Sequence, residues 1–115
     1  MASLFLRIDL NSDGHIGPGK VDLLEQISEC GSIAAAGRAM GMSYRRAWEL
    51  VEELNAMFGR PLVASRTGGK AGGGAELTPL GYLLVGRYRA MQKAAERASQ
   101  AHIEAIQAEL KAKRS

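Results

Sequence analysis

The stretch from Gly31 to Gly59, GSIAAAGRAMGMSYRRAWELVEELNAMFG, decides the fold of this chain. It reads as two helices joined by a short turn. Ser32 is placed to cap the first helix, because a serine hydroxyl accepts hydrogen bonds from the free backbone N–H groups of an opening turn. We expect this helix from Ile33 to Met40, ending at Gly41, since glycine adopts the left-handed conformation at little cost.

The second helix is expected to run from a cap at Ser43 to Phe58. Its apolar side chains recur at three- and four-residue steps, which places them on one buried face. They are Ala47, Leu50, Val51, Leu54, Met57 and Phe58. Small residues, Ala36, Gly37 and Ala47, lie where the two helices would cross closely. This combination predicts a helix-turn-helix, in which the second helix enters the DNA major groove.

The start of the second helix carries residue types that read DNA. Arg45 and Arg46 are adjacent at a helix start, where positive charge opposes the helix dipole, so helix stability does not account for them. The candidate DNA-contacting residues of this unit are Ser32, Ser43, Tyr44, Arg45, Arg46 and Glu49. The alternative is a generic helical hairpin whose arginines are solvated.

Length and composition bound these interpretations. The 115 residues fit one domain, and a net charge of +3 permits a polyanion partner without demanding one. Cys30 is the only cysteine, and we expect it to be buried at the end of a helix. The first residues carry Arg7 and Asp9, which argues against a signal peptide. We therefore expect a cytoplasmic chain with no membrane partner.

Titratable side chains are scattered over amphipathic segments. No nucleophile stands beside a base, which argues against an enzyme. His15 and His102 are the only histidines and lie far apart in the sequence, so we expect no metal site and no cofactor.

The segments before the helix-turn-helix have their own patterns. Leu4 to Leu10 alternates apolar and polar residues, which predicts a half-buried strand. Asn11 to Gly14 is a dense turn signal. Pro18 suits the first turn of a supporting helix that would end at Gly31.

The segment after the second helix reads as a hairpin. Short strands are expected at Leu62–Arg66 and Ala75–Leu77, around a glycine-rich tip at Thr67–Gly74. A hairpin that directly follows a recognition helix is typical of the wing of a winged-helix domain. Its candidate DNA contacts are Arg66, Thr67, Gly68, Gly69 and Lys70. The alternative, a nucleotide phosphate loop, fails because Ala64 and Ala71 stand where its glycine and its Ser or Thr belong.

From Thr78 onward the pattern is one long helix, with Thr78 as cap and Pro79 in its first position. A narrow, alanine-rich stripe along it indicates pairing between two copies. Its candidate dimer residues are Leu84, Tyr88, Met91, Ala95, Ala98 and His102. Packing within one chain is the alternative. The predicted fold is mainly α with a small β wing: a winged helix-turn-helix at residues 1–77 and a dimerisation helix at 78–115, in one structural unit.

Two blocks are specific enough to indicate a family. SYRRAWELVEELN and TGGKAGGGAELTPLG resemble the N-terminal DNA-binding domain of ModE-type molybdate-responsive transcription regulators. More distantly, the PLV-x-x-R…LT-x-x-G layout from Pro61 to Gly81 is similar to the winged-helix domains of LysR-type regulators. The resemblance implies a dimer on operator DNA. It carries Ser43–Arg46 onto the recognition helix and Thr67–Lys70 onto the wing.

Family members that sense molybdate carry C-terminal oxyanion-binding domains. This chain ends at Ser115 without one, so we expect no molybdate response from the chain itself. Regulation would then come from expression level, from a separate effector-binding protein, or from a small ligand at the dimer interface. The function predicted is a sequence-specific transcription regulator that binds double-stranded, palindromic operator DNA as a homodimer. The alternative is a short dimerising partner that modulates a longer regulator of the same family.

Overall fold

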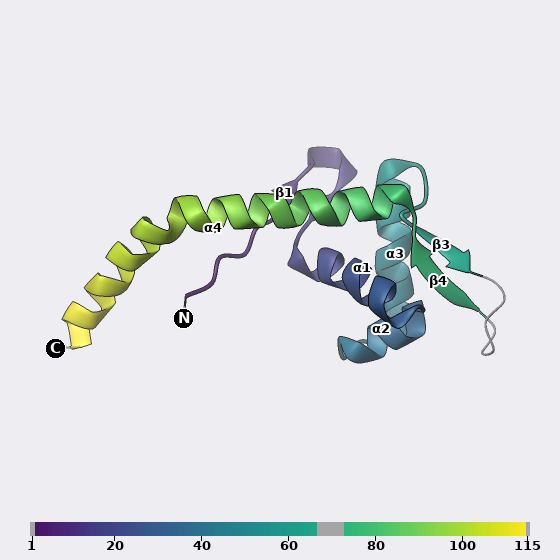
Figure 1. The fold of residues 1–115 in the computed structure, drawn as a ribbon, viewed down its shortest axis with the longest axis horizontal. Helices are drawn as coiled ribbons and strands as arrows, with labels where there is room; N and C mark the ends of the chain where they lie inside the picture. Colours follow the sequence, from purple (N-terminus) through teal and green to yellow (C-terminus); the bar gives the residue numbers. More distant parts are fainter. Residues whose placement is uncertain (1, 67–72, 115) are drawn as a thin grey trace.

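The order of elements confirms the predicted architecture. The structure, a computed structural model, describes residues 2–66 and 73–114. Within them the helices are α1 (Pro18–Cys30), α2 (Ile33–Ala39), α3 (Tyr44–Phe58) and α4 (Pro79–Arg114). The strands pair antiparallel, β1 (Ile8–Asp9) with β2 (His15–Ile16) and β3 (Val63–Arg66) with β4 (Gly74–Leu77), and one turn of 3-10 helix covers Asn11–Asp13. In Figure 1, α1 to α3 and the β3–β4 hairpin gather at one end, and α4 extends away from them.

The two helices of the helix-turn-helix are capped as predicted. The Ser32 hydroxyl accepts a hydrogen bond from the Ala35 backbone N–H at 3.0 Å, and the Ser43 hydroxyl accepts one from Arg46 at 3.1 Å. The helices also cross closely at small residues. A methyl group added at Gly37 would lie 3.2 Å from the Cβ of Ala47. Helix α2 ends at Ala39, one residue before the predicted end.

The core lies between α1, α3, the β3–β4 hairpin and the first turns of α4. The α3 residues Ala47, Leu50, Val51 and Leu54 are buried, as the apolar repeat predicts. Met57 is partly buried and packs against this core. The repeat is wrong at Phe58, which is 36% exposed because it stands in the last turn of α3, beside the Gly59 cap. The fully buried large side chains are Tyr88, Leu23, Leu24, Ile27, Leu54, Leu62 and Val21.

The N-terminal strand is shorter than predicted. Even-numbered residues from Leu4 to Leu10 are partly buried and the odd-numbered ones are exposed, so the alternation is confirmed. Only Ile8 and Asp9 form a strand, because β2 offers them just two partners, Ile16 and His15. The prediction of a buried Cys30 is also wrong. Cys30 is exposed at the end of α1, and its thiol contacts Gln26 at 3.6 Å.

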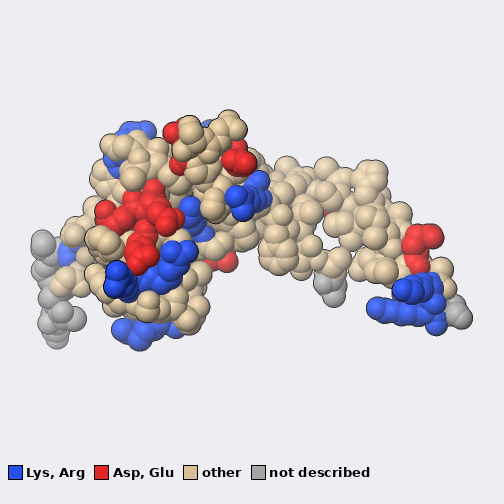
Figure 2. Space-filling view, turned by 180° about the vertical axis from the view of Figure 1, so that it is seen from behind, with Lys and Arg blue, Asp and Glu red and all other residues tan. Residues whose placement is uncertain are grey.

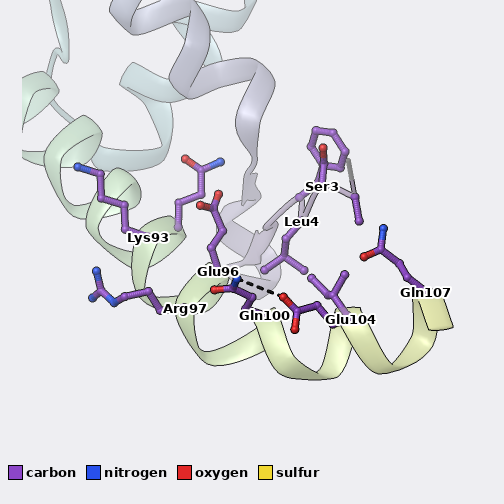
Figure 3. Close-up of a pocket in the computed structure, with 12 residues that line it drawn as sticks. Ser3, Leu4, Lys93, Glu96, Arg97, Gln100, Glu104 and Gln107 are labelled. Atoms are coloured by element: carbon purple, nitrogen blue, oxygen red, sulfur yellow. Dashed lines mark hydrogen bonds between the residues drawn. The ribbon is translucent and has the colours of Figure 1, made fainter.

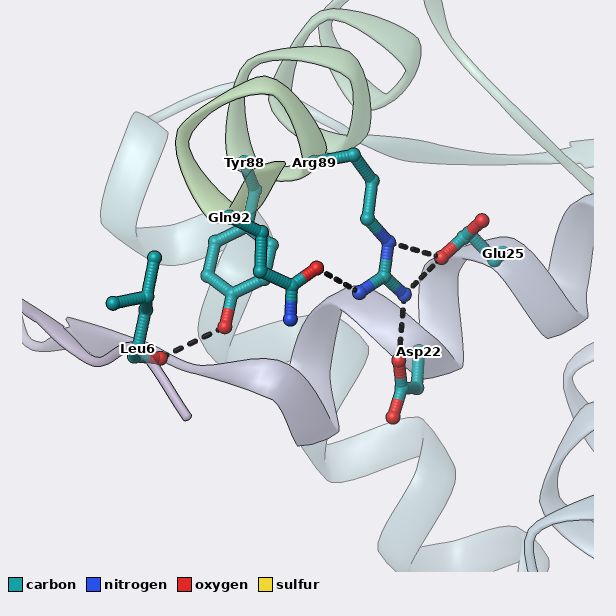
Figure 4. A network of polar contacts seen from close by, with 6 residues as sticks. All are labelled: Leu6, Asp22, Glu25, Tyr88, Arg89 and Gln92. Carbon is teal, nitrogen blue, oxygen red and sulfur yellow. Dashed lines mark hydrogen bonds and ion pairs between the residues drawn. The ribbon is translucent and has the colours of Figure 1, made fainter. Parts of the chain in front are cut away.

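The first turns of α4 are fixed to the rest of the domain (Figure 4). The Tyr88 hydroxyl donates to the Leu6 carbonyl at 2.8 Å, and burial raises the pKa of this phenol, which keeps its proton. Arg89 pairs with two carboxylates of α1, with Asp22 at 2.6 Å and with Glu25. Its guanidinium also donates to the Gln92 side-chain oxygen at 2.8 Å. These contacts hold α4 along α1.

The start of α4 lies against the segment Pro61–Leu62, which leads into β3. The Thr78 hydroxyl caps α4 by accepting from the Gly81 N–H at 3.2 Å, and it donates to the Pro61 carbonyl at 2.8 Å. A methyl group at Gly81 would lie only 2.4 Å from the Leu62 carbonyl oxygen.

Among the described helices, none combines the length and apolar character that crossing a bilayer would require.

Candidate nucleic-acid interface

The two arginines predicted to read DNA are exposed at the start of α3. The side chains of Arg45 and Arg46 are 89% and 54% exposed. Glu49 lies between them: its carboxylate accepts from Arg45 Nε at 3.2 Å and lies 3.8 Å from a terminal nitrogen of Arg46. Exposed ion pairs of this kind are weak. Glu49 therefore orients both arginines while leaving them available to another partner.

The turn of the helix gives each of these side chains a direction. Successive residues of an α-helix are rotated by about 100° around its axis. On that geometry Arg45 lies opposite the buried face of Ala47 and Leu54, and points straight out from the domain. Arg46 lies on one flank of this outward face, and Tyr44 and Trp48 lie together on the other. The outward face of α3 is thus one arginine between a second arginine and an aromatic pair.

Charge is unevenly distributed over this side of the molecule. Figure 2 shows the face from behind, where α3 lies nearer the viewer than in Figure 1. Lys and Arg gather along the lower rim of the domain, where α2 and the start of α3 lie, while Asp and Glu gather above them. The exposed arginines of these elements are Arg38, Arg45 and Arg46. Positive charge is therefore concentrated at the end of α3 that a helix-turn-helix presents to DNA.

The other predicted DNA-contacting residues are the two serines and the residues of the wing. Ser32 and Ser43 cap helices, which is a structural role, and their contact with DNA stays a prediction. Arg66 is exposed on β3. Its guanidinium lies close to Gly31, at the junction of α1 and α2: a methyl group added at Gly31 would be 3.0 Å from the Arg66 Nη2 atom. Thr67, Gly68, Gly69 and Lys70 lie outside the described residues.

A groove runs between α3 and the β3–β4 hairpin. Its volume is about 310 Å³, and its walls include Tyr44, Trp48 and Glu52 of α3, Ile33 of α2 and Ser65 of β3. The sequence pattern predicted Tyr44 as a DNA contact but did not single out Trp48, which lines the same groove. The signal was present, since Trp48 stands four residues after Tyr44 and outside the apolar repeat that builds the core.

The predicted dimer seam on α4 divides into two parts. Leu84 and Tyr88 are 8% and 0% exposed because they pack into the chain's own core, so the chain itself already covers them. Met91 is 43% exposed, Ala98 and His102 are exposed, and Ala95 is half-buried. Further along the helix Ile106 and Leu110 are 63% and 52% exposed.

A second cavity, of about 810 Å³, lies between the N-terminal segment and the middle of α4 (Figure 3). Leu4 and Ser3 form one wall. Side chains of both charge signs, including Lys93, Glu96 and Arg97, stand on the α4 wall. Opposite charges side by side do not select a ligand of either sign. Among the described residues, no three His, Cys, Asp or Glu side chains gather as a metal site requires.

Comparison with known proteins places this geometry in a family. Residues 19–82 match the bacterial regulatory helix-turn-helix proteins of the lysR family. Over 77 residues the chain is 46% identical to the molybdenum-pterin-binding protein MopB of Rhodobacter capsulatus, covering 67% of this chain and 28% of that protein. Over 95 residues it is 38% identical to the transcriptional regulator ModE of Haemophilus influenzae, covering 83% and 37%. The ModE-type resemblance is confirmed, and the chain spans little more than a third of these relatives at most.

The fold agrees with a DNA-bound structure. The crystal structure of a CbnR_DBD–DNA complex superimposes with a TM-score of 0.58 over 76% of this chain and 95% of that one, at 22% identity. A likeness at this identity concerns the fold, which is the winged helix predicted from the sequence. Taken with the family match over residues 19–82, it leads to one conclusion: the chain belongs to the lysR family of bacterial regulatory helix-turn-helix proteins.

Proposed function

We propose that this chain is a sequence-specific transcription regulator that binds operator DNA as a homodimer in the cytoplasm. The observation that carries the proposal is the exposed pair Arg45 and Arg46 at the start of α3, the second helix of the helix-turn-helix. In such units the first residues of this helix meet base edges. An arginine binds the O6 and N7 atoms of guanine with two hydrogen bonds, which discriminates by about 1–3 kcal/mol against the wrong base.

The two arginines have different parts in this proposal. Arg45 points straight out from α3, so it is the candidate for base reading. Arg46 lies on the flank of the helix, where a phosphate of the groove wall would be its partner. Phosphate contacts position the protein on the duplex and contribute affinity without sequence preference. Lys70 and Arg66 of the wing would contribute further phosphate contacts.

The dimer would form through the part of α4 that the chain does not cover itself. Met91, Ala95, Ala98 and His102 form a stripe with small residues at its centre, which suits close pairing of two helices. A two-fold dimer presents two α3 helices in opposite directions. It would therefore bind a palindromic operator whose half-sites lie about 34 Å apart or a multiple of that spacing.

The test starts from a random pool of DNA duplexes, from which the duplexes that bind the 115-residue chain are selected. The affinity for the selected duplex is then measured by fluorescence anisotropy for the parent, Arg45→Ala and Arg46→Ala. We expect both variants to bind more weakly, and Arg45→Ala also to lose base preference at one position of each half-site. Arg97→Ala removes the same charge from an exposed position on α4 and is the matched control. Equal affinity for all four proteins would refute the proposal, and so would a chain that selects no sequence. The second result would instead favour a partner that modulates a longer regulator.

A further inference from the structure

We infer that Trp48 and Tyr44 form an apolar edge of the reading surface, on which Trp48 contacts a thymine methyl group in the major groove. The inference rests on the proposed binding of DNA by α3. It adds a second kind of base recognition, which differs from the guanine recognition assigned to Arg45 in both chemistry and position.

The two aromatic side chains are unusually open for their type. Trp48 is 45% exposed and Tyr44 is 57% exposed, although both stand on a helix whose other face forms the core. They lie four residues apart, so they are neighbours on the same side of α3. Trp and Tyr are enriched at binding surfaces because they offer a large apolar area together with a polar tip. The domain leaves this area uncovered beside the exposed Arg45 and Arg46.

The residues that line the groove beside Trp48 and Tyr44 indicate which part of DNA these two side chains would contact. Glu52 lines the same groove, two turns after Tyr44, and its carboxylate would repel a phosphate. The neighbouring walls include the apolar side chains of Ile33 and Val63. A phosphate contact is therefore disfavoured on this flank of α3, and an uncharged, apolar group of the base edges is favoured.

The major groove contains one such group. The donor and acceptor atoms of the four bases line its floor, and the thymine C5-methyl group is the apolar feature among them. Trp48 lies three residues after Arg45, which is about 4.5 Å along the helix axis and about 60° around it. Base pairs in B-DNA are stacked about 3.4 Å apart. When Arg45 reads one base pair, Trp48 thus reaches the base pair next to it.

A first experiment uses the fact that Trp48 is the only tryptophan in the chain, so its fluorescence reports this side chain alone. Quenching by acrylamide is measured for the free protein, for the complex with the selected operator, and for a shuffled duplex of the same composition. We expect the operator to reduce the quenching constant at least twofold and the shuffled duplex to reduce it less. If the operator binds by anisotropy but leaves quenching unchanged, the inference is wrong while the proposed function stands. If neither duplex binds, the proposed function fails first.

A second experiment removes the methyl group itself. Each thymine of the selected operator is replaced in turn by deoxyuridine, which lacks only that methyl, and affinity is measured for the parent, Trp48→Ala and Phe58→Ala. Burial of one methyl group is worth about 0.8 kcal/mol, or about fourfold in affinity. We expect one deoxyuridine position per half-site to weaken the parent about fourfold and to have no effect on Trp48→Ala.

The control variant keeps this experiment decisive. Phe58 is also an exposed aromatic of α3, but it lies about 15 Å further along the helix axis. Phe58→Ala should keep the deoxyuridine sensitivity of the parent. Trp48→Phe, which retains an apolar ring, should keep part of it and serves if Trp48→Ala does not fold. A deoxyuridine effect that persists in both Trp48 variants, or that is absent in the parent, would overturn the inference.

Discussion

Replacement of Gly81 by alanine tests how the long helix is joined to the DNA-binding domain. Gly81 lies in the first turn of α4 and is buried against the chain that leads into β3. A methyl group there would stand 2.4 Å from the Leu62 carbonyl oxygen and 3.2 Å from the Leu77 Cβ. The first of these contacts involves a backbone atom, which cannot rotate away as a flexible side chain would.

The change in the free energy of unfolding that we expect for Gly81→Ala is the sum of two opposing contributions. Alanine is favoured over glycine within a helix by about 1 kcal/mol. Overpacking of a well-filled site costs about 1–3 kcal/mol, and a collision with backbone belongs at the upper end of that range. We therefore expect Gly81→Ala to lower the free energy of unfolding by about 2 kcal/mol.

Gly86 provides the matched control on the same helix. It is exposed, and a methyl group there would meet no atom within 4 Å, so Gly86→Ala should raise the free energy of unfolding by up to about 1 kcal/mol. Urea unfolding at one protein concentration measures both variants, since the stability of the proposed dimer would depend on concentration. A Gly81→Ala chain as stable as Gly86→Ala would refute the docking of α4 on the Leu62 carbonyl.

Three further predictions concern charge and assembly. Arg89→Ala removes the partner of Asp22 and Glu25, and we expect urea unfolding to show a loss of about 1 kcal/mol. This is the value for an ion pair in contact with solvent, since the side chains of Arg89, Asp22 and Glu25 are 30%, 50% and 39% exposed. A loss of zero would mean that these carboxylates do not hold α4. Met91→Lys places a charge on the proposed seam, and sedimentation should show monomers at concentrations where the parent is a dimer; equal sedimentation would exclude Met91 from the seam. Lys70→Ala should lower the slope of log affinity against log salt by roughly one, and an unchanged slope would remove Lys70 from the interface.

Local signals predicted most of the fold because each acts within a few residues. The serine caps of α2 and α3 act within one turn, and the apolar repeat of α3 depends on steps of three and four residues. The structure confirms the caps, and the repeat from Ala47 to Leu54. Phe58 and Cys30 were predicted wrongly for one reason. Each continues an apolar repeat to the last turn of a helix, where the partner elements no longer cover it.

Long-range contacts account for what the sequence pattern could not show. Leu84 and Tyr88 continue the same stripe as Met91, so periodicity alone assigned them all to one seam. In the structure the stripe meets the domain's own core first and becomes exposed only beyond Tyr88. The point of change depends on how far α1 and the N-terminal segment reach along α4, which is set by the pairing of Arg89 and Tyr88 with residues more than 60 positions away.

The same contacts connect the proposed dimer seam to the domain that carries α3. Tyr88 and Arg89 fix the direction of α4 against α1 and the N-terminal segment, and the exposed part of the stripe begins at Met91, less than one turn later. No loop separates the two parts, because α4 continues unbroken from Pro79 to Arg114. Pairing of two α4 helices would therefore set the distance and angle between the two copies of α3. Loosening the Arg89 contacts would then broaden the tolerated spacing of operator half-sites, although Arg89 pairs with α1 and does not belong to α3.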